Sequence, residues 1–207
     1  MGEPAGQYFE AEPTAPSRRS TARLDLPDRS LTLTTDRGVF SADRIDPGTK
    51  YLLLEAPAAP VAGTFVDLGC GYGPIACTLA ARSPEATVWA VDVNTRARAL
   101  CAENATRNGI ANVRVAAPDK VPSDHRFGAI WSNPPIRIGK LAVHDLLLRW
   151  LPRLTPEGAA CLVVQKHLGA DSLQQWLTNS GYAAERIAVG AGFRILRVTP
   201  LGFHVSA

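Results

Sequence analysis

Three glycines alternate with other residues in the stretch DLGCGYGP at 67–74, directly after a β-branched and apolar run at 64–66. Glycine lets a backbone turn tightly and lets a ligand approach closely, which a Cβ would prevent. A strand that runs into such a turn and then into a helix is the first part of a nucleotide-binding βαβ unit. The same turn also occurs without a ligand, so neighbouring residues must decide between these alternatives.

The acid that opens this stretch separates two classes of ligand. A dinucleotide fingerprint has glycine three residues after its second glycine, and position 74 here is Pro74. Asp67 would repel a pyrophosphate, but it attracts the ammonium group of a methionine moiety. S-adenosylmethionine (SAM) carries that ammonium and has no phosphates. We therefore expect a SAM site that includes Asp67, Gly69, Cys70 and Gly71.

Two further acids follow the next predicted strands. Asp92 ends the strand at 87–92, about 20 residues past the glycines, where an acid in this fold hydrogen-bonds the ribose hydroxyls. Asp92 and the adjacent Val93 are therefore predicted cofactor contacts, and the alternative for Asp92 is a cap for the helix that starts at Asn94. Asp119, after the third strand, is a candidate acceptor for the adenine amino group, or an ordinary loop acid.

A second candidate site is the sequence SNPPI at 132–136, where the fourth predicted strand ends. Two prolines fix φ and remove two N–H donors, so the carbonyls of Asn133 and Pro134 should meet no competing local N–H group. The Asn133 side-chain oxygen and the Pro134 carbonyl, stiffened by Pro135, could accept both hydrogens of a planar NH₂ group and direct its lone pair at an electrophile. Pro-Pro is also an effective plain strand stop.

The elements that must position these residues alternate between strands and helices from residue 63 onward, which predicts a parallel sheet with crossover helices. The expected strands are at 64–67, 87–92, 113–115, 129–132 and 159–164, and the expected helices are at 74–82, 95–107, 140–151 and 170–179. A final pair of strands at about 183–189 and 193–199 would make the sheet mixed.

The segment before residue 63 is less regular. Residues 1–29 contain four prolines among charges and predict an extended or partly disordered arm. The runs at 31–34 and 38–41 predict a short hairpin with its turn at Asp36-Arg37. The sequence DPGT at 46–49 predicts the start of a helix.

Bulk properties exclude several classes of protein. The chain has 207 residues, a net charge of +3 and 20% charged residues, which is typical of one soluble domain that permits, but does not require, a nucleic-acid partner. Its four cysteines lack the spacing of a zinc site or a disulfide framework, so no metal is expected. No run approaches the roughly 20 apolar residues of a membrane span, and the N-terminus lacks a secretory signal, so we expect a cytoplasmic protein.

The chain resembles class I SAM-dependent methyltransferases that modify planar nitrogens. The resemblance is carried by DLGCGYGPI at 67–75, by SNPPIRIG at 132–139, and by the lead-in that runs from GVFS at 38–41 to DPGT at 46–49. The sequence is most similar to the ribosomal RNA small-subunit methyltransferase C type, over about residues 30–200. This resemblance implies one methyltransferase domain at 30–207. It also implies an α/β, Rossmann-like fold with a mostly parallel seven-stranded sheet, an antiparallel C-terminal strand, and helices on both faces.

The resemblance further implies that Asp67, Gly69, Gly71, Asp92 and Asp119 line the SAM site, that Asn133 to Pro135 hold a guanine amino group, and that ribosomal RNA or the small subunit is the partner. No obligate protein partner is evident.

Two departures from the family pattern affect how the substrate would be recognised. Position 136 is Ile136 where the family pattern has an aromatic residue, so a stacking ring for a flipped base is missing there. The larger relatives also carry a second, N-terminal domain of similar fold. Arg137 and Lys140 directly follow the motif and, with Ile136, form the predicted substrate contacts. Arg149 and Arg153 are expected either on the same surface, where they could contact phosphates that flank an extruded base, or at a solvated helix end.

Two other functions remain open. A protein glutamine amide presents the same planar NH₂ group to Asn133 and Pro134. Alternatively, the chain is a SAM-binding module without catalysis that acts through a partner. The intact acids at 67 and 92 and Asn133 argue against the second alternative, because an idle module does not need an acceptor for an amine.

Overall fold

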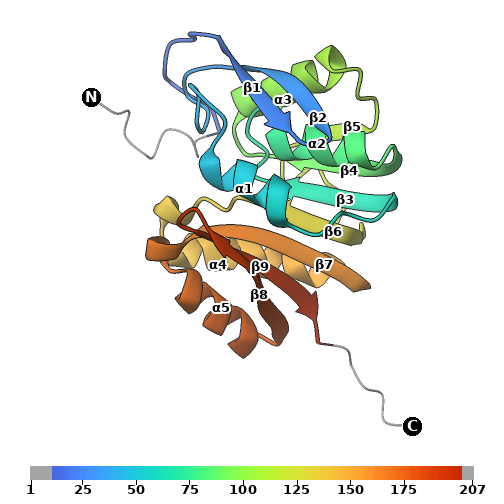
Figure 1. Cartoon of the computed structure of the whole chain (residues 1–207), viewed down its shortest axis with the longest axis vertical. Coiled ribbons are helices and arrows are strands. Elements are labelled where there is room, and N and C mark those ends of the chain that lie inside the picture. The colour runs from blue at the N-terminus through green and yellow to red at the C-terminus, as the bar shows by residue number, and fades with distance from the viewer. Residues whose placement is uncertain (1–10, 202–207) are drawn as a thin grey trace.

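The computed structural model describes residues 11–201. A seven-stranded sheet with helices on both sides and a separate two-stranded hairpin make up this part of the chain (Figure 1). In chain order the strands and helices are β1 (Ser20–Leu26), β2 (Arg29–Thr35), α1 (Pro47–Glu55), β3 (Ala62–Leu68), α2 (Pro74–Arg82), β4 (Glu85–Val91), α3 (Thr95–Arg107), β5 (Val113–Ala116), β6 (Phe127–Ser132), α4 (Lys140–Trp150), β7 (Leu154–Gln165), α5 (Ala170–Asn179), β8 (Tyr182–Gly190) and β9 (Phe193–Pro200).

The strands of the large sheet have the order β5-β4-β3-β6-β7-β9-β8. β3, β4, β5, β6 and β7 pair in parallel, whereas β9 is antiparallel to both of its neighbours. The chain therefore leaves the sheet at the carboxyl ends of β3 and β6, which are adjacent strands. Ligands bind at this edge of an open α/β sheet, where the strand order reverses.

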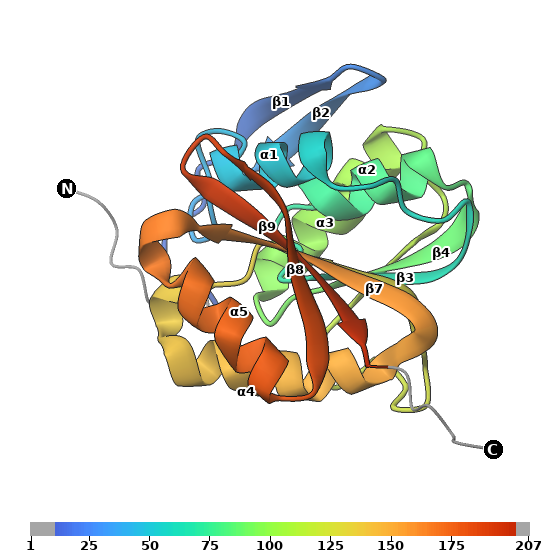
Figure 2. The same cartoon turned by 60° about the horizontal axis from the view of Figure 1, so that its bottom comes forward.

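Each face of the sheet has its own apolar core. On one face α1, α2, α3 and the hairpin pack over residues such as Leu33, Phe65 and Leu79, and on the other α4 and α5 pack over Ile130 and Trp150 (Figures 1 and 2). The central strands are buried on both sides, which explains why β3 and β6 are almost continuously apolar. The sequence prediction of a mixed sheet with helices on both faces is confirmed.

The predicted hairpin was placed one strand too late. The structure pairs β1 with β2 from Leu26↔Arg29 to Ser20↔Thr35, and the segment at 38–41 is a turn. Pro27 lies in the hairpin turn rather than within a strand, and Leu24, Leu26 and Leu31 point toward the core in the alternation that a strand requires. The predicted arm at 1–29 thus contains a complete strand, and its residues 1–10 lie outside the described part of the chain.

No helix within residues 11–201 is long and apolar enough to cross a membrane.

Candidate active site

The three glycines of the turn after β3 have two different structural roles. All three have positive φ: 72° at Gly69, 54° at Gly71 and 94° at Gly73. A Cβ built on Gly69 or Gly71 meets no atom within 4 Å, whereas one on Gly73 would lie 2.7 Å from the Cys101 sulfur. Gly73 therefore allows α2 and α3 to pack closely, and the other two leave open space beside the backbone.

Asp92 holds this turn in place. Its Oδ2 accepts a hydrogen bond from the Gly71 N–H at 2.9 Å, and its Oδ1 accepts one from the Asn94 N–H at 2.9 Å. Burial raises the pKa of Asp92, although these two N–H groups oppose the shift. The helix cap that was the alternative role for Asp92 belongs to Asn94, whose side chain accepts from the Ala97 N–H.

Asp67 is fully buried beneath the turn. Its Oδ2 accepts from the Ala76 N–H at 2.9 Å, in the first turn of α2, while its Oδ1 has no hydrogen-bond partner among the described residues. Burial raises the pKa of Asp67 well above its usual range, the Ala76 N–H opposes this, and the charge of Asp92 adds to it. A carboxylate with one orphaned oxygen costs free energy unless a positive group reaches it.

A narrow pocket lies beside the turn and brings together three segments that are far apart in the sequence. The pocket is lined by residues of the lead-in from Phe40 to Thr49, by the glycine turn and the start of α2, and by Asn133. Phe40 is 43% exposed although it is a large apolar side chain. The lining residues are Phe40, Ser41, Asp46, Thr49, Gly69, Cys70, Gly71, Tyr72, Pro74, Ile75 and Asn133.

Asn133 is oriented by the first turn of α1. Its Nδ2 donates to the Asp46 Oδ1 at 2.7 Å and to the Thr49 Oγ1 at 3.1 Å. A carboxylate only accepts hydrogen bonds, so the amide nitrogen must face Asp46 and the amide oxygen must face away from it. Asp46 is also the N-cap of α1, where it accepts from the Thr49 N–H at 2.9 Å. The side-chain oxygen of Asn133 is thereby left available to accept from a ligand.

The prediction that no local N–H competes for the carbonyl of Pro134 is wrong. This carbonyl accepts from the Ile136 N–H at 2.8 Å, because Pro135, with φ −75° and ψ 67°, is the centre of an inverse γ-turn just before the short 3₁₀ helix Ile136–Ile138. A carbonyl oxygen has two lone pairs, so one remains for a second donor.

The predicted substrate residues lie at the start of α4. Lys140 is exposed and Ile136 is half-buried against the core beneath α4 and α5. The side chain of Arg137 lies outside the described part of the structure. Arg149 lies in the last turn of α4, and Arg153 lies in the short 3₁₀ helix Leu151–Arg153 that follows. Since α4 rises about 1.5 Å per residue, Lys140 and Arg149 are separated by roughly 14 Å along it.

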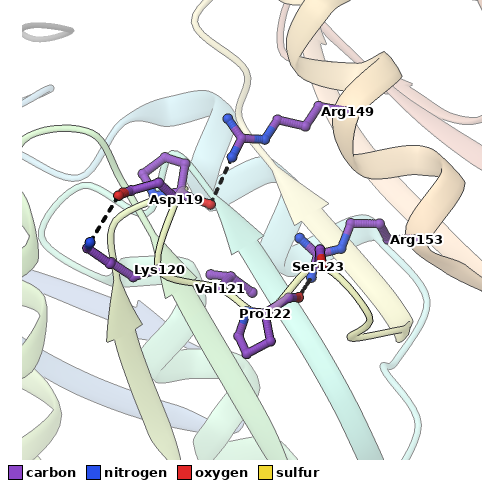
Figure 3. A pocket seen from close by; sticks show the side chains of 8 residues that line it. Asp119, Lys120, Val121, Pro122, Ser123, Arg149 and Arg153 are labelled. Carbon is purple, nitrogen blue, oxygen red and sulfur yellow. Dashed lines mark hydrogen bonds and ion pairs between the residues drawn. The ribbon is translucent and has the colours of Figure 1, made fainter.

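Of the remaining predicted cofactor residues, Cys70 lines the pocket but Asp119 does not. Cys70 lines the pocket and is buried, and Val93 is 43% exposed immediately after Asp92. Asp119 is exposed, pairs with Lys120 at 3.3 Å, and lines a different groove, together with Arg149 and Arg153 (Figure 3). The structure therefore does not bring the Asp119 side chain to the pocket that holds Asn133.

Asp46, Thr49 and Tyr72 are site residues that the sequence reasoning missed. The DPGT sequence correctly predicted the start of α1, but nothing in it indicates that this helix turn contacts Asn133, 84 residues later. Tyr72 was visible only as part of the turn; its hydroxyl donates to the Arg44 carbonyl at 3.2 Å and ties the lead-in to the glycines. Among residues 11–201 there is no group of His, Cys, Asp or Glu side chains that could hold a metal.

A family model describes this arrangement. Residues 30–197 match the methyltransferase small domain. The chain belongs to this family. It therefore has a class I, Rossmann-like methyltransferase domain, as the glycine turn and the Asn-Pro-Pro motif predicted.

Individual relatives agree with the family. The chain is 38% identical to the uncharacterized protein YbxB of Bacillus subtilis over 168 residues, which are 80% of this chain and 84% of that protein. It is 34% identical to the ribosomal RNA small subunit methyltransferase C of Shewanella halifaxensis over 72% of this chain and 44% of that one. The chain thus spans less than half the length of this longer relative.

A solved structure has the same fold. The Thermus thermophilus 16S rRNA N2 G1207 methyltransferase, in complex with AdoMet and guanosine, superimposes with a TM-score of 0.73 at 22% identity, over 90% of this chain and 52% of that one.

Proposed function

We propose that this chain binds SAM in the pocket beside the glycine turn and transfers its methyl group to the exocyclic amino group of a guanine in ribosomal RNA. The observation that carries the proposal is the fixed amide of Asn133, whose nitrogen is held by Asp46 and Thr49 and whose oxygen is left to accept from an amine.

The residues around the turn fit SAM. The buried Oδ1 of Asp67 lacks a partner and would be compensated by the ammonium of the methionine moiety. The open space beside Gly69 and Gly71 lets a ligand approach the backbone, and Asp92 and Val93, which follow β4, would bind the ribose hydroxyls. Bound SAM supplies a methyl group on a positively charged sulfur.

Asn133 and Pro134 would hold the amine. One hydrogen of the NH₂ group binds the Asn133 Oδ1, and the other binds the free lone pair of the Pro134 carbonyl. Both contacts draw the nitrogen lone pair out of conjugation and aim it at the methyl group, so alignment and dipole placement do the chemical work. As the bond from nitrogen to the methyl group forms, the bond from sulfur to the methyl group would break, and S-adenosyl-L-homocysteine would leave as the product. The methylated nitrogen then loses a proton to solvent, and no strong general base is required.

RNA is the proposed substrate because the family relatives with a stated substrate, the small subunit methyltransferases C, act on ribosomal RNA. Lys140, exposed at the start of α4, adds positive charge beside the motif. A glutamine amide in a protein is the second candidate, since it presents the same planar NH₂ group and Ile136 supplies no ring on which a base could stack.

The deciding experiment incubates the purified protein with methyl-labelled SAM and with total RNA or total protein from a strain that lacks it. We expect label that is released by nuclease and recovered as methylguanosine. An Asn133→Ala preparation, matched for SAM binding by calorimetry, controls for contaminating methyltransferases.

Label confined to protease-sensitive material would replace the RNA proposal with the glutamine one. Tight SAM binding with no label in either fraction would leave a SAM-binding module that acts through a partner.

A further inference from the structure

A groove lies apart from the pocket that contains Asn133. Its volume is about 460 Å³, and it runs between the loop at 117–126 and the end of α4 (Figure 3). Its walls are formed by Pro118, Asp119, Lys120, Val121, Pro122, Ser123, Arg149 and Arg153. The catalytic proposal uses none of the cations in these walls.

The chain direction shows where the groove leads. The loop begins after β5, at the carboxyl edge of the sheet, and ends before β6, at the opposite edge. α4 also begins beside the Asn-Pro-Pro motif and runs toward that opposite edge. On the α4 side the groove is lined by Arg149 and Arg153, so it lies toward the end of α4 that is remote from the Asn-Pro-Pro motif.

The arginines of this surface are held by neutral groups. Arg149 donates to the Pro118 carbonyl at 3.1 Å, and Arg153 donates to the Pro122 carbonyl at 2.5 Å and to the His125 carbonyl at 3.2 Å (Figure 3). Arg126, next to the groove, donates to the Asp124 carbonyl at 3.1 Å. None of these three arginines forms an ion pair with a carboxylate among residues 11–201.

Carboxylates compensate their positive charge in part, because Asp119 lines the same groove, where it pairs with Lys120 at 3.3 Å and also interacts electrostatically with Arg149. Burial, followed by repulsion from Arg126 and Arg149, lowers the pKa of Arg153, and the carboxylate of Asp124 only partly opposes this. A guanidinium has five N–H donors, so the carbonyl contacts leave several donors free on each side chain.

Arg153 is also rigid. Its guanidinium carbon lies 4.6 Å from the centre of the Trp150 ring and 4.9 Å from that of Phe127. These rings and the two carbonyls fix the side chain before any ligand arrives, which reduces the entropy cost of binding.

We propose that this groove binds the phosphodiester backbone of single-stranded RNA at a distance from the reacting nucleotide, with Arg149, Arg153 and Arg126 as the phosphate contacts. A guanidinium whose position is fixed and whose charge is unpaired suits a phosphate oxygen, and the fork of donors binds it in two places. The inference rests on the proposed RNA substrate and adds a second contact surface to it. That surface offers charge to the substrate at a distance from Ile136, where base stacking is missing.

The test measures the binding of a fluorescent single-stranded RNA oligonucleotide as a function of salt. The double variant Arg126→Gln/Arg149→Gln removes two exposed charges and spares Arg153, which packs against Trp150. The matched control is Arg23→Gln/Arg107→Gln, which removes two exposed charges that pair with carboxylates elsewhere on the surface.

We expect the first double variant to bind RNA about tenfold more weakly at low salt. The slope of log K against log salt should become shallower by roughly 1.4, because each phosphate of a single strand that an arginine neutralises adds about 0.7 to it. The control should change neither quantity, and SAM affinity should be unchanged in both variants. KM for RNA should rise in the first variant while kcat stays near that of the wild type.

Equal RNA binding by the variant and the control would overturn the inference even if the wild type methylates RNA. If RNA does not bind to the wild-type protein, the inference is refuted. Conversely, the variant could lose RNA binding although the wild type does not methylate RNA. That result would support the groove as an RNA-binding surface and refute the proposed reaction.

Discussion

The side-chain amide of Asn133 and the carboxylate of Asp46 lie 2.7 Å apart, although 87 residues separate them in the sequence. Asp46 is the N-cap of α1 in the lead-in, and Asn133 directly follows β6 of the sheet. The carboxylate fixes which end of the amide faces the pocket, so Asp46 is a positioning residue for the proposed reaction.

Replacement of Asp46 separates this orientation from helix capping. Asp46→Ala should lower kcat by about 10- to 100-fold, because the Asn133 amide is no longer held in one orientation. It should also cost about 1 kcal/mol of unfolding free energy through loss of the N-cap. Asp46→Asn should restore much of the kcat and much of the unfolding free energy, since an asparagine oxygen can accept from Thr49 and Asn133. If both variants lost the same activity, the charge of Asp46, and not its geometry, would be what matters.

Removal of the amide itself should have a larger effect. Asn133→Ala should leave SAM bound, because the contacts proposed for the ammonium and ribose come from Asp67 and Asp92. Turnover in a single-turnover assay should fall by two to three orders of magnitude, as for loss of one oriented polar group in other enzymes. Wild-type turnover in this variant would refute the proposed role of the amide.

How much of this site the sequence predicts depends on the range of the interaction. α2 and α3 were predicted at their observed limits, 74–82 and 95–107, because local signals define them: Pro74 in the first turn of α2 and Asn94 as the cap of α3. The glycine turn and the Asn-Pro-Pro motif are also local patterns, and both lie where the strand order predicts.

The contacts that complete the site are long-range and leave no local pattern. Asn104 accepts from the Thr34 N–H and donates to the Tyr72 carbonyl, and so joins the hairpin, α3 and the glycine turn. Nothing in a helical asparagine predicts such partners. The hairpin was misplaced because its prolines and charges outweighed the alternation of Ala22, Leu24 and Leu26, which becomes informative only when α3 covers one face.

A methyl group on Gly71 should distinguish a cofactor turn from an ordinary one. Gly71→Ala places a Cβ in the open space beside the turn and should weaken SAM binding at least tenfold in calorimetry. Gly109→Ala is a matched control, because Gly109 also has positive φ, 68°, and equally open surroundings. Both substitutions cost roughly 1–2 kcal/mol of backbone strain. If the two variants bound SAM equally well, SAM would not contact the turn.

Thiol reactivity should report on the same pocket. The contact with Cys101 lowers the pKa of Cys70. Burial and the charges of Asp92 and Asp67 raise it by more, so that the pKa of Cys70 is raised to about 11. Burial also raises the pKa of Cys161 to about 11. Both thiols should therefore react slowly with a disulfide reagent at pH 8, because the thiolate is the reactive form.

SAM should slow the labelling of Cys70 further, because Cys70 lines the pocket, and should leave Cys161 unchanged as the internal reference. Peptide mapping by mass spectrometry after partial labelling measures both sites in one sample. Protection of neither thiol by saturating SAM would place the cofactor elsewhere.

The orphaned oxygen of Asp67 should make the binding of SAM depend on pH. Because burial raises the pKa of Asp67 in the folded protein, the folded state holds this proton up to a higher pH than the unfolded chain does. Without ligand, the free energy of unfolding should therefore fall as pH rises from about 4, the usual pKa of aspartate, through the raised pKa of Asp67.

The ammonium of SAM favours the carboxylate form of Asp67, so SAM binding should release a proton in this pH window and SAM affinity should rise with pH. Calorimetry in two buffers with different ionisation enthalpies measures this release. Asp67→Asn should abolish it, and the same proton release from the variant would show that the linked group is not Asp67.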